Sequence, residues 1–256
     1  MSEKEVNEND QDDSTLEEEM GFWDHLEELR KRLFWGVIGL VIACTITGIF
    51  HEFLIEQVLI RPSAEVGLNL QNLRVFGQPF FYFKIILVSG LILAFPFLLY
   101  QIWLFIEPGL YKTEKNWASK ITIFTSLCFL TGVAFAYFVM IPSMLKFAAS
   151  FGSEQIANNI DINEYLSFIT MILLAAGLLF EMPMISYILS KVGLLTPKIL
   201  RKYWRHSIIA ILILAAILTP TPDPVSQLIF AAPLFILYEI SIWISAIAVK
   251  KNKENE

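Results

Sequence analysis

The chain has 256 residues, of which 55% are hydrophobic and only 17% are charged. This balance is too apolar for a soluble domain of this length and indicates a membrane protein with several spans. The formal charge of −6 is unevenly distributed, because the first nineteen residues hold nine Asp and Glu against one Lys. We therefore expect residues 1–21 to form an acidic, disordered tail. This tail has neither the apolar core of a signal peptide nor the arginines of a transit peptide.

The stretch Phe22–Leu33 (FWDHLEELRKRL) predicts a charged helix that leads directly into a membrane span. Apolar residues recur in it at steps of four, three and four, which is the spacing of one helical face. Its acids and bases stand immediately before the uncharged stretch Leu33–Phe50 and would lie at the membrane surface. Such a helix is either a simple stop signal or a docking surface.

Six apolar stretches predict six membrane-spanning helices in an all-α fold. A span needs roughly 20 residues to cross about 30 Å of hydrocarbon. The fifth stretch is shorter, because no helix continues through the proline-rich run that follows it, Thr219–Pro224. The fifth and sixth are therefore a re-entrant pair or short spans, and we favour short spans. The stretches are Leu33–Phe50, Phe80–Ile106, Ile121–Ile141, Tyr165–Leu189, Ser207–Leu218 and Leu228–Val249.

The basic residues predict the orientation of these spans. Fifteen of the 19 Lys and Arg fall in the four segments that lie on the same side as the N-terminus, namely 1–32, 107–120, 190–206 and 250–256. Because basic residues concentrate in cytoplasmic loops, we expect both termini in the cytoplasm. Residues 22–249 then form one membrane domain, and 250–256 a short tail. The outer connections 51–74 and 142–164 are long enough to cover the outer face, and Asp161 or Asn163 would start the helix that follows.

Two glutamates lie within the predicted spans, where a carboxylate costs roughly 2.5–3.5 kcal/mol or more. Glu181 precedes Pro183, which would kink the fourth helix by leaving the carbonyl of Leu179 without its partner. Glu181 is either a protonated acid that is hydrogen-bonded inside the bundle or a polar contact for another protein's helix or a water-filled concavity. Glu239, in the last span, would lie nearer an interface.

Two more acids are expected on the cytoplasmic side. Glu114 alone would be an ordinary loop acid, and Glu28 alone would pair with Arg32 one helical turn away. Together, Glu28 and Glu114 could receive the planar forks of arginine side chains. Such a site would bind a basic peptide without catalysing a reaction.

The sequence gives little support for an enzyme. His25, His51 and His206 are scattered, no zinc-protease or serine-hydrolase motif occurs, and the spans lack an aspartate pair. Cys44 and Cys128 both lie in apolar runs. We therefore expect no catalytic residue, no metal, no cofactor and no nucleic-acid partner. A proton-coupled transporter of small solutes that uses Glu181 is the alternative function, although the halves show no repeat, and a purely structural scaffold is a third.

Several motifs together resemble one family. His25–Leu33 (HLEELRKRL) resembles the amino-terminal signature of TatC, the receptor subunit of the twin-arginine protein translocase. The resemblance covers residues 22–249 and leaves out the acidic tail. It continues through Tyr100–Glu114 (YQIWLFIEPGLYKTE), Gly132–Phe138 (GVAFAYF), Tyr165–Phe168 (YLSF), Phe180–Pro183 (FEMP) and Thr219–Gln227 (TPTPDPVSQ).

The resemblance implies a concave six-span receptor in a bacterial plasma membrane, which exports folded proteins at the expense of the proton-motive force. By motif, Glu28 and Glu114 would bind the arginine pair of signal peptides, and Arg30 would help shape that site. Glu181 would line the concave face and contact single-span partner subunits of the TatA and TatB types. Self-association in the receptor complex is also implied.

Asp223 and Gln227 match polar positions of the family where partner helices pack. The chain has Thr-Pro-Asp-Pro where the family often has Pro-Pro-Asp, so the role of Asp223 is the least defined of these.

Overall fold

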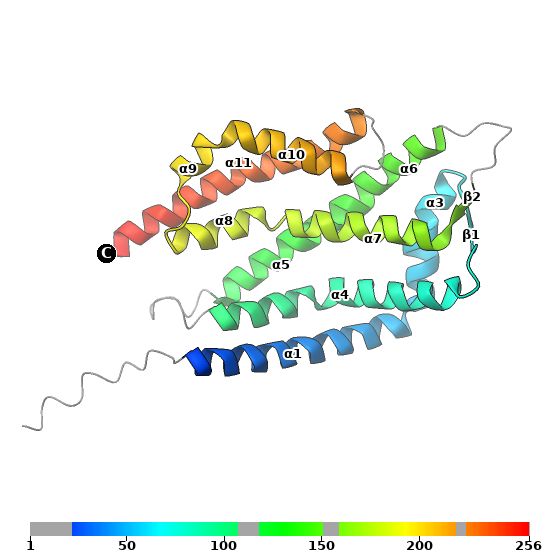
Figure 1. Cartoon of the computed structure of the whole chain (residues 1–256), viewed down its shortest axis with the longest axis horizontal. Helices are drawn as coiled ribbons and strands as arrows, with labels where there is room; N and C mark the ends of the chain where they lie inside the picture. Colours follow the sequence, from blue (N-terminus) through cyan, green and yellow to red (C-terminus); the bar gives the residue numbers. More distant parts are fainter. Residues whose placement is uncertain (1–21, 107–117, 151–158, 219–223, 256) are drawn as a thin grey trace, which may run out of the picture.

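The structure is a computed structural model that describes residues 22–106, 118–150, 159–218 and 224–255, nearly all of them helical (Figure 1). Short elements gather at one end of the bundle, the cap end, whereas α1 begins and α11 ends at the other, the terminal end. The elements in chain order are α1 (Phe22–Ile49), α2 (His51–Phe53), η2 (Leu54–Ile60, π-helical), α3 (Arg61–Glu65), β1 (Asn69–Gln71), α4 (Gly77–Ile106), α5 (Ala118–Phe135), η5 (Ala136–Met140, π-helical), α6 (Ile141–Ser150), β2 (Asn159–Asp161), α7 (Ile162–Leu179), α8 (Met182–Lys191), α9 (Pro197–Lys202), α10 (Trp204–Leu218) and α11 (Pro224–Asn255).

The six predicted spans are present. Five apolar helical stretches are long enough to cross a membrane, and the fifth span, α10, is short as predicted: its 15 residues extend about 22 Å. The prediction of a short sixth span is wrong, because α11 has 32 residues and is apolar over 24 of them. The proline-rich run shortens only the helix before it, since a proline such as Pro224 is well tolerated at the first position of the helix that follows. The five long stretches are His25–Ile49, Gly77–Phe105, Ile121–Ser150, Ile162–Lys191 and Gln227–Lys250.

Two pairs of helices approach closely because glycines lie between them. A Cβ atom on Gly90 of α4 would lie 2.9 Å from the Cα of Cys44 on α1. A Cβ atom on Gly132 of α5 would lie 2.7 Å from the carbonyl oxygen of Ala176 on α7. Small residues let membrane helices pack backbone against backbone. These contacts hold α1 against α4 and α5 against α7.

The fourth span is interrupted between α7 and α8. Helical hydrogen bonding ends at Phe180, and α8 begins at Met182 with Pro183 in its first turn. Because Pro183 has no N–H group to donate to the carbonyl of Leu179, the helix breaks there. The predicted kink is confirmed, and it puts Glu181 at the break.

The cap end joins segments that are far apart in the chain. Strands β1 and β2 pair in parallel, with Leu70 opposite Ile160. The hydroxyls of Tyr137 and Tyr165 donate to carbonyl oxygens of η2, at 3.0 Å and 2.8 Å. The described parts of the two connections therefore cover this end as predicted, whereas no pattern in the sequence indicates the strand pair.

Polar contacts also fix the last two spans to the bundle. The hydroxyl oxygens of Ser190 on α8 and Ser245 on α11 lie 2.6 Å apart in the interior. Tyr238 on α11 donates to the carbonyl oxygen of Leu200 on α9 at 2.7 Å. The short helix α9 is thereby attached to α11 at the terminal end of the bundle.

Candidate functional site

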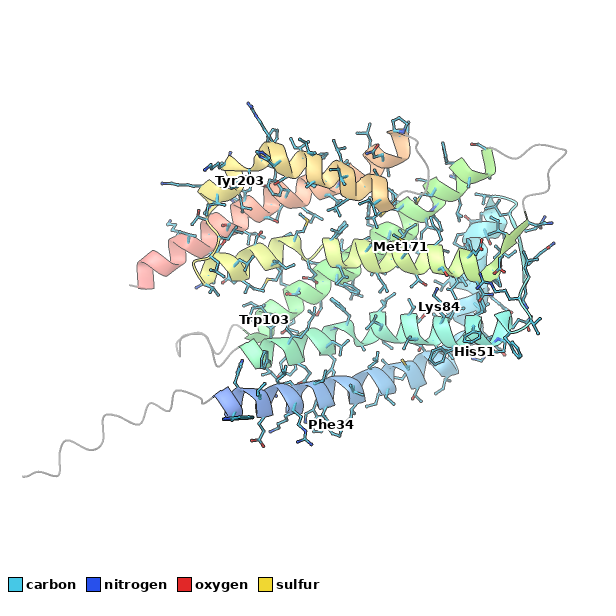
Figure 2. The ribbon with its side chains drawn as sticks, viewed as in Figure 1. Phe34, His51, Lys84, Trp103, Met171 and Tyr203 are labelled. Atoms are coloured by element: carbon cyan, nitrogen blue, oxygen red, sulfur yellow. The ribbon has the colours of Figure 1, made fainter. Side chains whose placement is uncertain are left out.

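The first turns of α1 direct one row of side chains toward α4. His25, Glu28, Arg32 and Gly36 follow one another at steps of three, four and four, so they share a helical face. Gly36 lies against Leu98 of α4, and the ring of His25 stacks on that of Phe105 at a centroid distance of 4.4 Å. Glu28 therefore points toward the terminal end of α4. Phe34, on another face, points away from the bundle (Figure 2).

Glu28 is already bound to a guanidinium group. Nη2 of Arg32 donates to Oε1 of Glu28 at 3.1 Å, and the two side chains are 25% and 21% exposed. This is the pair one helical turn apart that the sequence offered as the ordinary role of Glu28. Only one of the two carboxylate oxygens takes part in this contact, so the carboxylate retains acceptor capacity for a second donor.

Described residues that flank the segment 107–117 pack together. Trp103, near the end of α4, packs with Ile121 of α5 and Met184 of α8 in a small apolar cluster (Figure 2). This cluster fixes the point where the chain leaves α4 and the point where it returns. Glu114, the second predicted arginine-binding acid, lies outside the described residues.

Arg30 lies on a different side of α1 from Glu28. Residues two apart on a helix do not face each other, and the Arg30 side chain is exposed. In the described part of the chain it forms no ion pair with a carboxylate. A direct contact between Arg30 and Glu28 is therefore absent.

A cavity of about 600 Å³ opens in the cap half of the bundle. Its walls come from the end of α1, from η2, α4, α5, η5 and α7, and are almost entirely apolar, with hydroxyls such as those of Thr47 and Ser89 as exceptions. The predicted concave bundle thus contains a real hollow. A space of this size and character suits the apolar part of a ligand.

Glu181 is enclosed instead of lining that cavity. It is 6% exposed, and neither carboxylate oxygen has a hydrogen-bond partner among the described residues. The residues lining the cavity on α7 end at Leu173, two turns before Glu181. A buried carboxylate without a partner is costly in hydrocarbon, so the polar contact predicted for Glu181 is not supplied by the described chain.

The other polar residues of the last two spans have local partners. Glu239 accepts a hydrogen bond from Nε1 of Trp204 at 2.7 Å, at the start of α10, which agrees with its expected place near an interface. Gln227 donates to the carbonyl oxygen of Leu212 on α10 at 3.0 Å. Asp223 lies outside the described residues.

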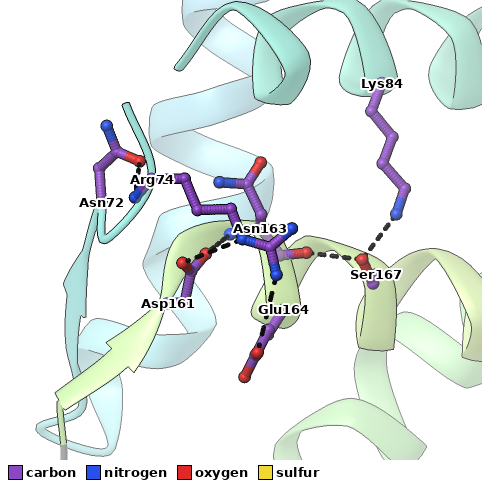
Figure 3. Close-up of polar contacts among 7 residues, drawn as sticks. All are labelled: Asn72, Arg74, Lys84, Asp161, Asn163, Glu164 and Ser167. Atoms are coloured by element: carbon purple, nitrogen blue, oxygen red, sulfur yellow. Dashed lines mark hydrogen bonds and ion pairs between the residues drawn. The ribbon is translucent and has the colours of Figure 1, made fainter. Parts of the chain in front are cut away.

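The cap end carries a polar cluster that the sequence did not reveal (Figure 3). Asp161 caps α7 by accepting from the backbone N–H of Asn163 at 2.7 Å, which confirms the predicted helix start. Nε of Arg74 lies 3.6 Å from Oδ2 of Asp161, and its Nη2 lies 3.8 Å from Oε1 of Glu164. Desolvation of Asp161 acts to raise the pKa of its carboxyl, but hydrogen bonds from Asn163 and the charge of Arg74 outweigh it, so the pKa is lowered.

Among the residues that the structure describes, no group of three or more His, Cys, Asp or Glu could hold a metal ion. At the terminal end the ion pair of Glu28 and Arg32 lies against α4, and an apolar hollow lies farther along the bundle. These features define a polytopic membrane protein with charged side chains at one end of its bundle and an apolar hollow within it.

Comparison with known proteins identifies the family. The family model "Sec-independent protein translocase protein (TatC)" matches residues 24–233, and the chain belongs to the TatC family. It is 39% identical over 232 residues to the TatC protein of Helicobacter pylori strain 26695, covering 91% of this chain and 90% of that one. It is 35% identical to that of Deinococcus radiodurans, with 88% and 85% covered.

The fold agrees with solved structures of the family. A crystal structure described as the twin arginine translocase receptor TatC matches with a TM-score of 0.73 and 36% identity, over 88% of this chain and 99% of that one. A second, in the detergent DDM, matches with a TM-score of 0.75 and 35% identity, over 86% and 99%. The chain is therefore a multi-pass membrane component of the Sec-independent translocase, in a family of transport proteins and not of enzymes.

Proposed function

We propose that the chain is the receptor of its translocase for signal peptides that carry an arginine pair. The pair docks at the terminal end on Glu28 and Glu114, and Arg30 contributes to the shape of the site. In this proposal the terminal end faces the cytoplasm of a bacterial cell, the chain lies in the plasma membrane, and the cargo is folded.

The observation that carries the proposal is the contact between Glu28 and Arg32. It demonstrates that the Glu28 carboxylate can accept a guanidinium group in a half-buried position, where a charged hydrogen bond is stronger than in open solvent. A signal arginine would take up the free acceptor capacity or displace Arg32. The stacking of His25 on Phe105 supports the proposed role of Glu114. Phe105 lies at the end of α4, just before the segment of the sequence that contains Glu114.

The apolar part of the signal peptide would follow the bundle into the hollow of about 600 Å³. The walls of that hollow suit an apolar segment and offer little to a charged solute. This favours a receptor over a transporter of small polar solutes.

Partner subunits of the TatA and TatB types complete the proposal. The carboxylate of Glu181 has no partner in the described chain, so a polar group from a neighbouring membrane helix is the contact it needs. Gln227 and Asp223 are proposed as further contacts near the cap end. Occupancy by a signal peptide would favour recruitment of partners and self-association, and the proton-motive force would drive transport.

Peptide binding tests the docking step. Purified chain should bind a twin-arginine signal peptide and lose most of that affinity when both arginines are replaced by lysine, because the charge is kept and only the guanidinium geometry is lost. The double substitution E28Q/E114Q should abolish the preference for arginine. Equal binding of both peptides by the native chain would contradict the proposal.

Co-purification tests the assembly step. Glu181→Gln should reduce the recovery of single-span partner subunits with the chain, because an amide group offers a polar partner different hydrogen-bond donors and acceptors from those of a carboxyl group. Glu239→Gln is the matched control, since that acid lies in another span and already has Trp204 as partner. Unchanged recovery with Glu181→Gln would remove Glu181 from the assembly surface.

A further inference from the structure

Four cations line one face of the chain where α9 leads into α10. Lys198, Arg201, Lys202 and Arg205 follow at steps of three, one and three, which places them on one side of a helix. The turn at Tyr203 does not break this face, because Tyr203 N–H donates to Ile199 at 3.1 Å and Ser207 N–H donates to Tyr203 at 3.0 Å. All four side chains are exposed. We call this set the basic stripe.

The basic stripe is not neutralised by the described chain. The segment 190–206 contains no Asp or Glu, and within the described residues none of the four cations forms an ion pair. By contrast, Arg32, Arg61 and Arg74 each have a carboxylate partner. Four like charges within eight residues repel one another, so the stripe favours an anionic ligand.

The stripe is held at the level of the membrane surface. Tyr238 anchors α9 to α11, and α10 runs from Trp204 into the membrane as an apolar helix. Trp and Tyr prefer the zone of the lipid headgroups, and both Tyr203 and Trp204 are exposed beside the stripe. Val192 and Leu194 expose further apolar surface in the preceding turn. The four cations therefore lie where phosphate groups of lipids would lie.

We propose that the basic stripe binds the headgroups of anionic phospholipids in the adjacent leaflet. Clusters of four or more Lys and Arg directly next to a span, with aromatic residues at the same level, have the charge and depth for this ligand. A signal peptide with paired arginines is excluded as the ligand, because it is itself cationic. The proposal is independent of the receptor function.

Native mass spectrometry with added lipid tests this proposal. The intact chain in detergent is titrated with phosphatidylglycerol and, separately, with phosphatidylcholine of the same acyl chains. The native chain should retain phosphatidylglycerol preferentially. R201Q/K202Q should weaken that binding about tenfold, since each cation near an anionic surface contributes severalfold. R201K/K202R should retain phosphatidylglycerol binding, because both substitutions keep the positive charge of the stripe.

The matched control is R61Q/K146Q, which also removes one Arg and one Lys but at the cap end. It should change phosphatidylglycerol binding by less than about twofold. Equal retention of the two lipids by the native chain, or an equal loss in the control, would overturn the proposal. A competition experiment could also overturn the proposal. If a Glu-rich peptide displaced phosphatidylglycerol from the native chain but not from R201Q/K202Q, the stripe would be assigned to an acidic protein partner.

Discussion

At the cap end of the bundle ion pairs join distant stretches of chain, whereas at the terminal end the described ion pair lies within one helical turn and the cations of the basic stripe are exposed. Arg74 joins the first outer connection to Asp161 of the second, and two tyrosine hydroxyls close onto η2. At the terminal end, the ion pair that Glu28 forms within the described residues is with Arg32, one turn away, and no described residue forms an ion pair with the basic stripe. The contacts of the cap end thus join distant segments, and the terminal end is the one that we propose to bind ligands.

The largest loss of stability should follow Asp161→Ala. The substitution removes the cap of α7 and one of the two acidic partners of Arg74, and we expect the midpoint of thermal unfolding to fall by about 4 °C. Differential scanning fluorimetry of the detergent-purified chain measures this. Glu65→Ala is the control, because it removes an exposed carboxylate from an i,i+4 pair at the same end. An equal fall in the two variants would contradict a special role of Asp161.

A fall in pH should lower the stability of the native chain, as Asp161→Ala does, because it neutralises the Asp161 carboxylate. Because the pKa of Asp161 is lowered in the folded protein, its charge contributes stability at and above its ordinary pKa of about 3.9. That contribution is lost as the pH falls below about 4 through the lowered pKa. The difference in unfolding midpoint between the native chain and Asp161→Asn should therefore shrink from pH 6 to pH 3. A constant difference would show that the charge is unimportant.

Tyr165→Phe should have a smaller effect on the same end. The buried hydroxyl donates to the carbonyl of Leu59, and its removal leaves that carbonyl without this donor, at a cost of about 1 kcal/mol. Thermal unfolding measures the change, with Tyr82→Phe, an exposed tyrosine of α4, as control. No difference between these two variants would mean that the contact with η2 adds nothing to stability.

Arg32→Gln, at the terminal end, should change stability least. A half-exposed pair one turn apart contributes about 0.3–0.5 kcal/mol to a helix. Freed from Arg32, however, Glu28 should bind a signal arginine about twofold more tightly. Fluorescence titration with labelled peptide measures this gain, and weaker binding would indicate that Arg32 supports the site instead of competing for it.

The sequence predicts local features well, because they depend on residues that are close in the chain. Apolar length predicted the six spans, Pro183 predicted the break before α8, and Asp161 or Asn163 was predicted to start α7, of which Asp161 is the cap. The prediction of a short sixth span is wrong, because the proline-rich run ends the helix before it but does not shorten the helix that begins after it. The pairing of Asn69 with Asn159 joins residues far apart in sequence, and strands of three residues carry no periodic pattern.

The candidate site could be predicted only in part, because it too depends on residues that are far apart in the chain. The sequence predicted the pairing of Glu28 with Arg32, which the structure confirms, and the structure adds the neighbourhood of Phe105. The binding of a signal arginine by Glu28 stays a prediction. The enclosure of Glu181 is a property of the assembled bundle, in which Phe180, the residue before it, packs against Gly132 of α5. Arg74 has acidic partners, whereas the basic stripe has no ion pair among the described residues. This difference likewise depends on which distant segments meet in the folded chain.

The most direct test of the division between the two ends is to measure signal-peptide binding in three forms of the chain: native, Asp161→Ala and Glu28→Gln. We predict that Asp161→Ala lowers the unfolding temperature but binds the twin-arginine peptide as the native chain does. Glu28→Gln should unfold at nearly the native temperature but bind at least about tenfold more weakly, as expected for the loss of a charged hydrogen bond. Native affinity in Glu28→Gln, or an equal loss of affinity in both variants, would contradict the account.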